Sequence, residues 1–343
     1  SKEALRNQAL VSIVMVFIQL NIGATVGYAG VVMSQIPAIS LDQNIIANSR
    51  NFSLKNPSTL EYNKALFSSL PFLGGAFGSV VGGISQAHLG QRRTLLLALP
   101  TASITWISLT LATSTAGVLA VRFLQGLVMG SMLVSSYSFT SEVAKAEVRG
   151  FVNGILAISQ EVGLLLVFWM GSIITWRSLA VICSFGLTII PFFGIIFIHD
   201  SPRWLAMCKS LDEAYDALVF YRSSAYDSKS ELFIINEQIK STKSSKLMNQ
   251  LKTIRIDNYT HSIIFLTIYV FVGQFTGNIV LVSNIVSIFN DADVDVDEYA
   301  STIVIGIARV AGAFAFTCIN EQVGRRAVLI PALYFCTPCL IIT

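Results

Sequence analysis

The chain has 343 residues, of which 53% are hydrophobic and 13% are charged, and its formal net charge is +3. Because a soluble domain carries roughly 25% charged residues, the composition excludes a soluble protein and indicates a membrane protein. The basic residues lie in loops and form no continuous patch, so we expect the lipid bilayer as a partner and no nucleic acid.

Apolar stretches of about 20 residues, the length that crosses a bilayer, recur along the chain. We predict membrane-spanning helices near 9–30, 65–87, 94–114, 117–140, 150–171, 178–198, 261–285 and 300–319. A ninth stretch begins at Ala327 and is still apolar at Thr343. We therefore expect the chain to be a fragment that lacks further C-terminal spans.

Lysine and arginine gather in alternate loops, which places those loops in the cytosol. They are Lys2, Arg6, Arg92, Arg93, Lys145, Arg149, Arg325 and Arg326. The loop 291–298 carries only acidic charges and is expected outside, as is the loop 31–64. That outer loop holds the sequon Asn51-Phe52-Ser53, so Asn51 is a candidate glycosylation site. We expect a multi-pass plasma-membrane protein with a cytosolic N-terminus.

The segment 200–260 differs from the rest because it is polar and carries charges of both signs. Ser210 is followed three residues later by Glu213, the pattern of a helix N-terminus with a capping box. Apolar residues then recur at helical spacing. The segment is expected to be a cytosolic helical linker, and a disordered charged loop is the alternative.

A short motif of glycine followed by arginines is repeated between apolar stretches: Gly90-Gln91-Arg92-Arg93 and Gly324-Arg325-Arg326. A glycine allows a tight turn between two helices, and the arginines can reach a carboxylate on a neighbouring helix. Repeats of this kind are typical of transporters built from related halves.

These motifs, with others in the same order, resemble the sugar porter family of the major facilitator superfamily, and most closely its insect facilitated trehalose transporter branch. The other segments that carry the resemblance are Arg122–Gly126, Ser141–Ala144, Asp200–Leu205 and Glu321–Arg326. The resemblance implies an all-α major facilitator fold with a six-span N-terminal bundle (1–199), a helical linker (200–260) and an incomplete C-terminal bundle (261–343).

The resemblance also implies a carrier that moves a sugar or a similar small polar solute by alternating access. Its inner-rim network, which stabilises one state and breaks in the other, maps onto Arg92, Arg93, Glu142, Arg149, Glu321, Arg325 and Arg326. A solvated positive rim without a gating role is the alternative for these charges.

The candidate solute site departs from the family pattern. In the seventh span, the sugar-binding run aligns with Gln274, Thr276 and Asn278, with one glutamine lost and the asparagine displaced by one position. The sugar-contacting glutamine of the fifth span aligns with Ala157. Because each lost hydrogen bond to a buried hydroxyl costs about 1–3 kcal/mol, simple sugar binding should be weakened.

Two ionisable residues occupy the middle of predicted spans: Glu161 in the fifth and Arg309 in the eighth. Charges at this depth are costly and normally face a cavity or a partner. We hypothesise that they pair with each other, or that Arg309 holds an anionic solute while Glu161 carries a proton. A buried ion pair with only a locking role is the alternative.

Motifs of catalysis are missing: the sequence has no phosphate-binding loop, zinc-type His-Glu-x-x-His or nucleophile elbow. We expect neither an enzyme nor a bound metal or cofactor. The alternative functions are a degenerate, non-transporting homologue that acts as a nutrient sensor, and a carrier of an anionic solute.

Overall fold

The computed structural model describes residues 2–35, 57–145, 147–222, 228–243, 259–274, 277, 298–324 and 327. All regular secondary structure in these ranges is helical. The first group of helices is α1 (Lys2–Gln35), α3 (Pro57–Leu89), α4 (Gln91–Leu111), α5 (Thr115–Val143), α6 (Arg149–Gly171), α7 (Trp176–Gly186) and α8 (Ile189–Ile196). The others are α9 (Pro202–Cys208), α10 (Leu211–Arg222), α11 (Ser228–Lys243), α13 (Tyr259–Gln274) and α15 (Glu298–Val323).

Seven helical stretches of the described chain are long and apolar enough to cross a membrane. They are Arg6–Met33, Ala65–Leu89, Gln91–Leu111, Thr115–Val143, Arg149–Gly171, Trp176–Ile196 and Ala300–Asn320. These stretches match the first six predicted spans and the eighth. In the seventh, the apolar stretch Ile264–Gln274 is shorter than a full span, and most of 275–285 lies outside the described residues.

The sixth predicted span consists of two helices, α7 and α8, with a break at Leu187 and Thr188. Pro191 explains the break, because its ring has no N–H for the Leu187 carbonyl and would clash with it in a continuous helix. Asn21 of α1 donates instead to the Leu187 oxygen at 3.5 Å. A neighbouring helix thus satisfies the carbonyl that proline leaves without a donor.

Glycines set the close approach of α3 and α5. A Cβ added at Gly78 would fall 2.0 Å from the Leu127 oxygen, and one at Gly74 would fall 2.2 Å from the Phe123 oxygen. On the opposite helix, a Cβ at Gly126 would fall 2.1 Å from the Pro71 oxygen. At these glycines the two helices therefore pack backbone against backbone, as small residues allow in membrane bundles.

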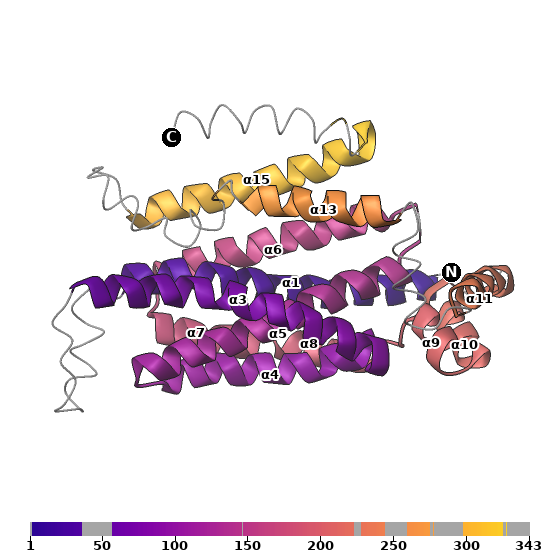
Figure 1. Ribbon diagram of the computed structural model, residues 1–343, viewed down its shortest axis with the longest axis horizontal. Helices are drawn as coiled ribbons and strands as arrows, with labels where there is room; N and C mark the ends of the chain where they lie inside the picture. The colour runs from indigo at the N-terminus through magenta and orange to yellow at the C-terminus, as the bar shows by residue number, and fades with distance from the viewer. Residues whose placement is uncertain are drawn as a thin grey trace.

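The helices α9, α10 and α11 gather at one end of the bundle, beside the start of α1 (Figure 1). Arg222 of α10 donates to the Val143 oxygen at the end of α5 at 2.7 Å and pairs with Glu231 of α11 at 3.2 Å. The predicted N-cap is present, since the Glu213 N–H donates to the Ser210 hydroxyl at 3.2 Å. The described part of the polar segment is thus helical and attached to the bundle.

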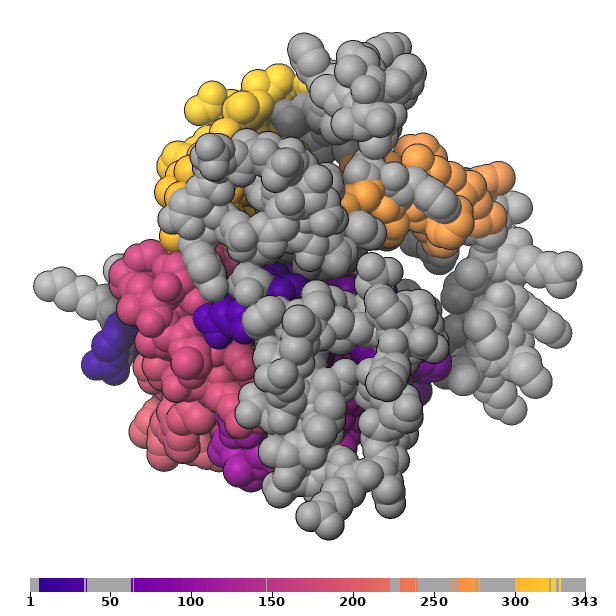
Figure 2. Space-filling view, turned by 90° about the vertical axis from the view of Figure 1, so that its left-hand side faces the viewer, coloured from indigo at the N-terminus to yellow at the C-terminus, as the bar shows by residue number. Residues whose placement is uncertain are grey.

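The helix α15 packs along α6 on one side of the N-terminal helices, and α13 lies on the same side (Figure 1). Figure 2, an end-on view, shows the yellow α15 directly against the pink part of the chain that includes α6. The division at 199 and 260 into two bundles and a linker stays a prediction. The contact that α15 makes with α6 positions the candidate site described below.

Candidate functional site

An ion pair joins α6 to α15 near the middle of both helices. Arg309 donates from Nε to Glu161 Oε2 at 2.7 Å and from Nη2 to Glu161 Oε1 at 2.8 Å. This two-point contact is among the strongest geometries for a guanidinium and a carboxylate. The side chains of Glu161 and Arg309 remain 21% and 23% exposed, so the pair is neither fully buried nor freely solvated.

The contacts on both sides of the pair show that α6 and α15 run antiparallel. A Cβ added at Gly154 would fall 2.3 Å from Thr317 Cγ2, and one at Gly306 would fall 2.8 Å from Leu165 Cδ1. Residues later in α6 therefore contact residues earlier in α15. Because glycine supplies one side of each flanking contact, the helices come close and Glu161 meets Arg309 at the centre of the interface.

The surroundings of Glu161 include residues from two helices. Tyr137 of α5 lies within the electrostatic range of its carboxylate. Ala157, one turn earlier on α6, is exposed and offers no polar group in the position where the resemblance expects a glutamine. The polar chemistry of this face of α6 is therefore concentrated in Glu161.

The predicted residues of the seventh span are not brought to this pair within the described chain. Gln274 ends α13 with an exposed side chain. Thr276 and Asn278 lie outside the described residues, as does the predicted glycosylation site Asn51. Their roles remain predictions.

The repeated glycine–arginine motif forms the same kind of turn at Gly90 and at Gly324. Gly90 has φ 87° and Gly324 has φ 89°, a left-handed conformation that glycine adopts at little cost. Each glycine N–H donates four residues back, to the Gln86 oxygen at 3.0 Å and to the Asn320 oxygen at 3.2 Å. The two turns lie at the same end of the bundle, the end that carries α9 to α11 (Figure 1).

The first turn leads into a polar network in which the acid is held by neutral donors. Glu142 Oε2 accepts from Gln91 Nε2 at 2.9 Å and also from the Ser201 hydroxyl. Arg92 instead reaches Asp200 at 3.8 Å and donates to the Ile195 and Ile196 oxygens at the end of α8. The network thus joins α4, α5 and the segment that enters α9.

The other predicted rim residues differ in how far the structure describes them. Arg93 and Arg149 are exposed. The side chain of Glu321 and the residues Arg325 and Arg326 lie outside what the structure describes. The network among all seven predicted charges therefore stays a prediction, whereas the arrangement around Arg92 and Glu142 is observed.

Asp200 lies in a segment that carries the family resemblance, but it is not among the predicted site residues. It is 8% exposed and lines a pocket of about 260 Å³ with Arg92, His199 and Lys209. Its Oδ1 has no hydrogen-bond partner within the described part of the chain. Burial raises the pKa of this carboxyl above its ordinary value, and Arg92, Arg93, Lys209 and His199 oppose the increase. The carboxyl group in this pocket therefore loses its proton at a higher pH than an exposed aspartate does.

Arg122 of α5 is a second residue that sequence reasoning missed. It is 1% exposed, donates to Gln125 Oε1 at 2.7 Å and to the Thr25 oxygen at 3.4 Å, and lies 4.5 Å from the centre of the Phe67 ring. A charge inside an apolar span was the signal that could have singled it out. These contacts hold α1, α3 and α5 together, and none of them involves Glu161 or Arg309.

A protein-family model described as "Sugar (and other) transporter" matches residues 13–343. Among curated proteins, the facilitated trehalose transporter Tret1 of Culex quinquefasciatus is 29% identical over 260 residues, covering 75% of this chain and 50% of that protein. Trehalose transporter 1 of Drosophila melanogaster is 28% identical over 260 residues, covering 75% of this chain and 30% of that protein. The chain spans about half or less of the length of these relatives.

Solved structures of the major facilitator superfamily share the fold. The proton:xylose symporter XylE bound to 6-bromo-6-deoxy-D-glucose gives a TM-score of 0.78 at 16% identity, covering 93% of this chain and 70% of that chain. A partially occluded inward-open form of XylE from E. coli gives 0.71 at 15% identity, covering 93% and 74%. The likeness confirms the predicted all-α fold.

Proposed function

Since the chain belongs to the sugar (and other) transporter family, a group of membrane transporters rather than enzymes, we propose that it is part of a carrier for a sugar or a similar small polar solute. The carrier works by alternating access, with the path running between the N-terminal helices and the helices from α13 onward. The pair of Glu161 and Arg309 supports this proposal most directly, because it joins the two sets of helices midway along their length.

The charge balance of the pair favours a neutral solute. The guanidinium of Arg309 directs two donors to a carboxylate of opposite charge, so the pair carries no net charge. An anionic solute would have to compete with Glu161 for Arg309, whereas the hydroxyls of a sugar can hydrogen-bond to either partner while the pair stays closed. The anion carrier is therefore the second candidate.

The α6–α15 contact also suggests how two states could exchange. The flanking contacts at Gly154 and Gly306 lie on opposite sides of the pair, so α15 can tilt about it and open one end while closing the other. Such rocking about a midplane site is how carriers of this architecture move solute. Protonation of Glu161 would weaken the pair, and this is the route by which proton coupling would act.

The experiment is uptake by the full-length protein reconstituted in vesicles, with labelled trehalose, glucose and an organic anion as separate substrates. The proposal expects uptake of at least one sugar above that of empty vesicles, and reduced uptake for Glu161→Gln. Glu213→Gln, a change in an exposed acid of α10, is the matched control and should leave uptake unchanged.

Three other results would point elsewhere. Uptake of the organic anion without any sugar would favour the anion carrier. Sugar binding without uptake would favour the non-transporting sensor. Sugar uptake by Glu161→Gln at the wild-type rate and with the wild-type pH dependence would remove the pair from the mechanism. The plasma-membrane location and the cytosolic N-terminus are part of the same proposal and can be checked by labelling intact cells.

A further inference from the structure

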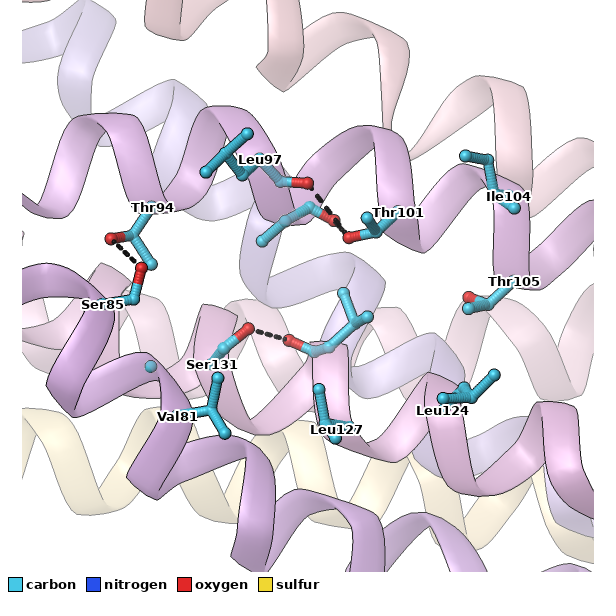
Figure 3. A pocket seen from close by; sticks show the side chains of 13 residues that line it. Val81, Ser85, Thr94, Leu97, Thr101, Ile104, Thr105, Leu124, Leu127 and Ser131 are labelled. Carbon is cyan, nitrogen blue, oxygen red and sulfur yellow. Dashed lines mark hydrogen bonds between the residues drawn. The ribbon is translucent and has the colours of Figure 1, made fainter. Parts of the chain in front are cut away.

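Residues of α3, α4 and α5 line a groove on the surface (Figure 3), and neither Glu161 nor Arg309 is among them. It encloses about 410 Å³, and its lining includes Val81, Leu97, Ile104 and Leu124. Each of these four side chains is at least half exposed. In a helix bundle that crosses a membrane, such a surface faces lipid or other apolar partners.

The hydroxyl groups on the groove walls do not make the groove polar, because their hydrogens are already directed to nearby oxygens. Thr94 donates to the Gly90 oxygen at 2.9 Å, and Ser85 bonds the Thr94 hydroxyl at 3.1 Å. Thr101 donates to the Leu97 oxygen at 3.0 Å, as Figure 3 shows. The walls therefore present mainly methyl and methylene groups, which suits an acyl chain and does not suit a sugar.

The length of the groove matches one leaflet of a bilayer. Along α4 its lining extends from Thr94, next to the α3–α4 turn, to Thr105. At 1.5 Å per residue this distance is about 16 Å. The hydrocarbon core of a bilayer is about 30 Å thick, so one leaflet contributes about half of that. An acyl chain lying in the groove would therefore place its headgroup at the α3–α4 turn.

The turn carries cationic chemistry at that level. Arg93 lies one turn before Leu97 on α4, and His88 lies one turn after Ser85 on α3, so both residues stand above groove-lining positions. Both are exposed, and neither makes a hydrogen bond or ion pair with any residue that the structure describes, although Arg93 lies within electrostatic range of Asp200. The neighbouring Arg92 is engaged by Asp200 and the end of α8. Arg93 is thus available to a ligand.

We propose that the α3–α4–α5 groove binds one acyl chain of an anionic phospholipid and that Arg93, assisted by His88, binds the phosphate of its headgroup. Anionic lipids are attracted by exposed arginines at a membrane surface, and an apolar groove beside the cation adds specificity for a lipid over a free anion. This inference needs only that the chain crosses the membrane, so it stands or falls separately from the transport proposal.

The test uses the full-length protein in detergent micelles that contain equal amounts of dioleoyl phosphatidylserine and dioleoyl phosphatidylcholine. Native mass spectrometry then counts the lipids of each kind that stay bound. The wild-type protein should retain phosphatidylserine in preference, and Arg93→Ala should lower that retention about fivefold. Arg177→Ala, an exposed arginine at the start of α7 that stacks on Trp176, is the matched control and should have no effect.

A second variant tests the groove itself. Thr101→Trp fills the groove from an exposed position and should reduce retention of both lipids, and Ile104→Trp replaces it if the first variant does not assemble. Equal retention of the two lipids by the wild-type protein would overturn the proposal. Loss of binding in Arg93→Ala with no change in both groove variants would also overturn it, because the headgroup would then bind without its chain.

Discussion

The strength of the Glu161–Arg309 pair can be measured by a double-mutant cycle with Glu161→Gln and Arg309→Met. At a charge separation of about 4 Å and an effective dielectric constant of about 20, the attraction is about 4 kcal/mol. Removing one partner of a fully buried pair costs about 3–5 kcal/mol. Since about a fifth of each side chain is exposed, we expect each single change to cost about 2 kcal/mol of unfolding free energy.

The double variant should lower the unfolding free energy by only about 1 kcal/mol, because no charge is left without a partner. The coupling energy, which is the sum of the two single losses less the loss in the double variant, is then about 3 kcal/mol. The assay is denaturant unfolding of the full-length protein in detergent micelles. Lys209 and Glu213, an exposed pair at 3.0 Å at the start of α10, provide the control cycle, and their coupling should be about 0.3–0.5 kcal/mol. If the two single losses of unfolding free energy at Glu161 and Arg309 simply add in the double variant, the two-point contact does not stabilise the protein.

Three further predictions concern the turns, the helix packing and the pH dependence of stability. Gly90→Ala should lower the unfolding free energy by about 2 kcal/mol, because it puts a side chain at positive φ and 3.0 Å from the Trp204 ring. Gly324→Ala, with nearly the same φ and nothing within 4 Å of the added Cβ, should lower the unfolding free energy by about 1 kcal/mol. Gly78→Ala should disrupt the α3–α5 contact and lower the melting temperature, while Gly83→Ala, which meets nothing within 4 Å, should change it little; equal effects would contradict the close packing. Burial raises the pKa of Asp200 above its unfolded value, so the stability that this carboxyl contributes is greatest below about pH 3.9 and falls as the pH rises toward the folded pKa. Asp200→Asn should therefore stabilise the protein at neutral pH relative to wild type and flatten the dependence of stability on pH in this range. Unfolding measured at several pH values tests this prediction.

The positions of the spans followed from apolar length, because a bilayer imposes one length on every helix that crosses it. The break between α7 and α8 could have been expected at Pro191, but its consequence could not. The Leu187 carbonyl that proline leaves open is met by Asn21, a residue far away in the sequence. Such long-range satisfaction of a backbone group depends on how the helices pack.

The pairing of Glu161 and Arg309 was predictable because charges in the middle of spans are rare and need partners. The polar network at the turn was less predictable. The prediction joined charges of opposite sign, whereas Glu142 is held by the neutral side chains of Gln91 and Ser201. Arg122 was missed because the residues that hold it come from several helices and supply carbonyls and rings, which a sequence pattern does not reveal.

The proposed transport mechanism requires α15 to rock against α6 about the Glu161–Arg309 pair. Spin labels at exposed positions on either side of the pair test it: Phe151 with Ile319, and Leu166 with Val304. The measurement uses the full-length protein without its native cysteines, reconstituted in vesicles, with and without a sugar that the uptake assay identifies as a substrate. One distance should lengthen while the other shortens when sugar is added. Two distances that stay constant, or that change in the same direction, would contradict it.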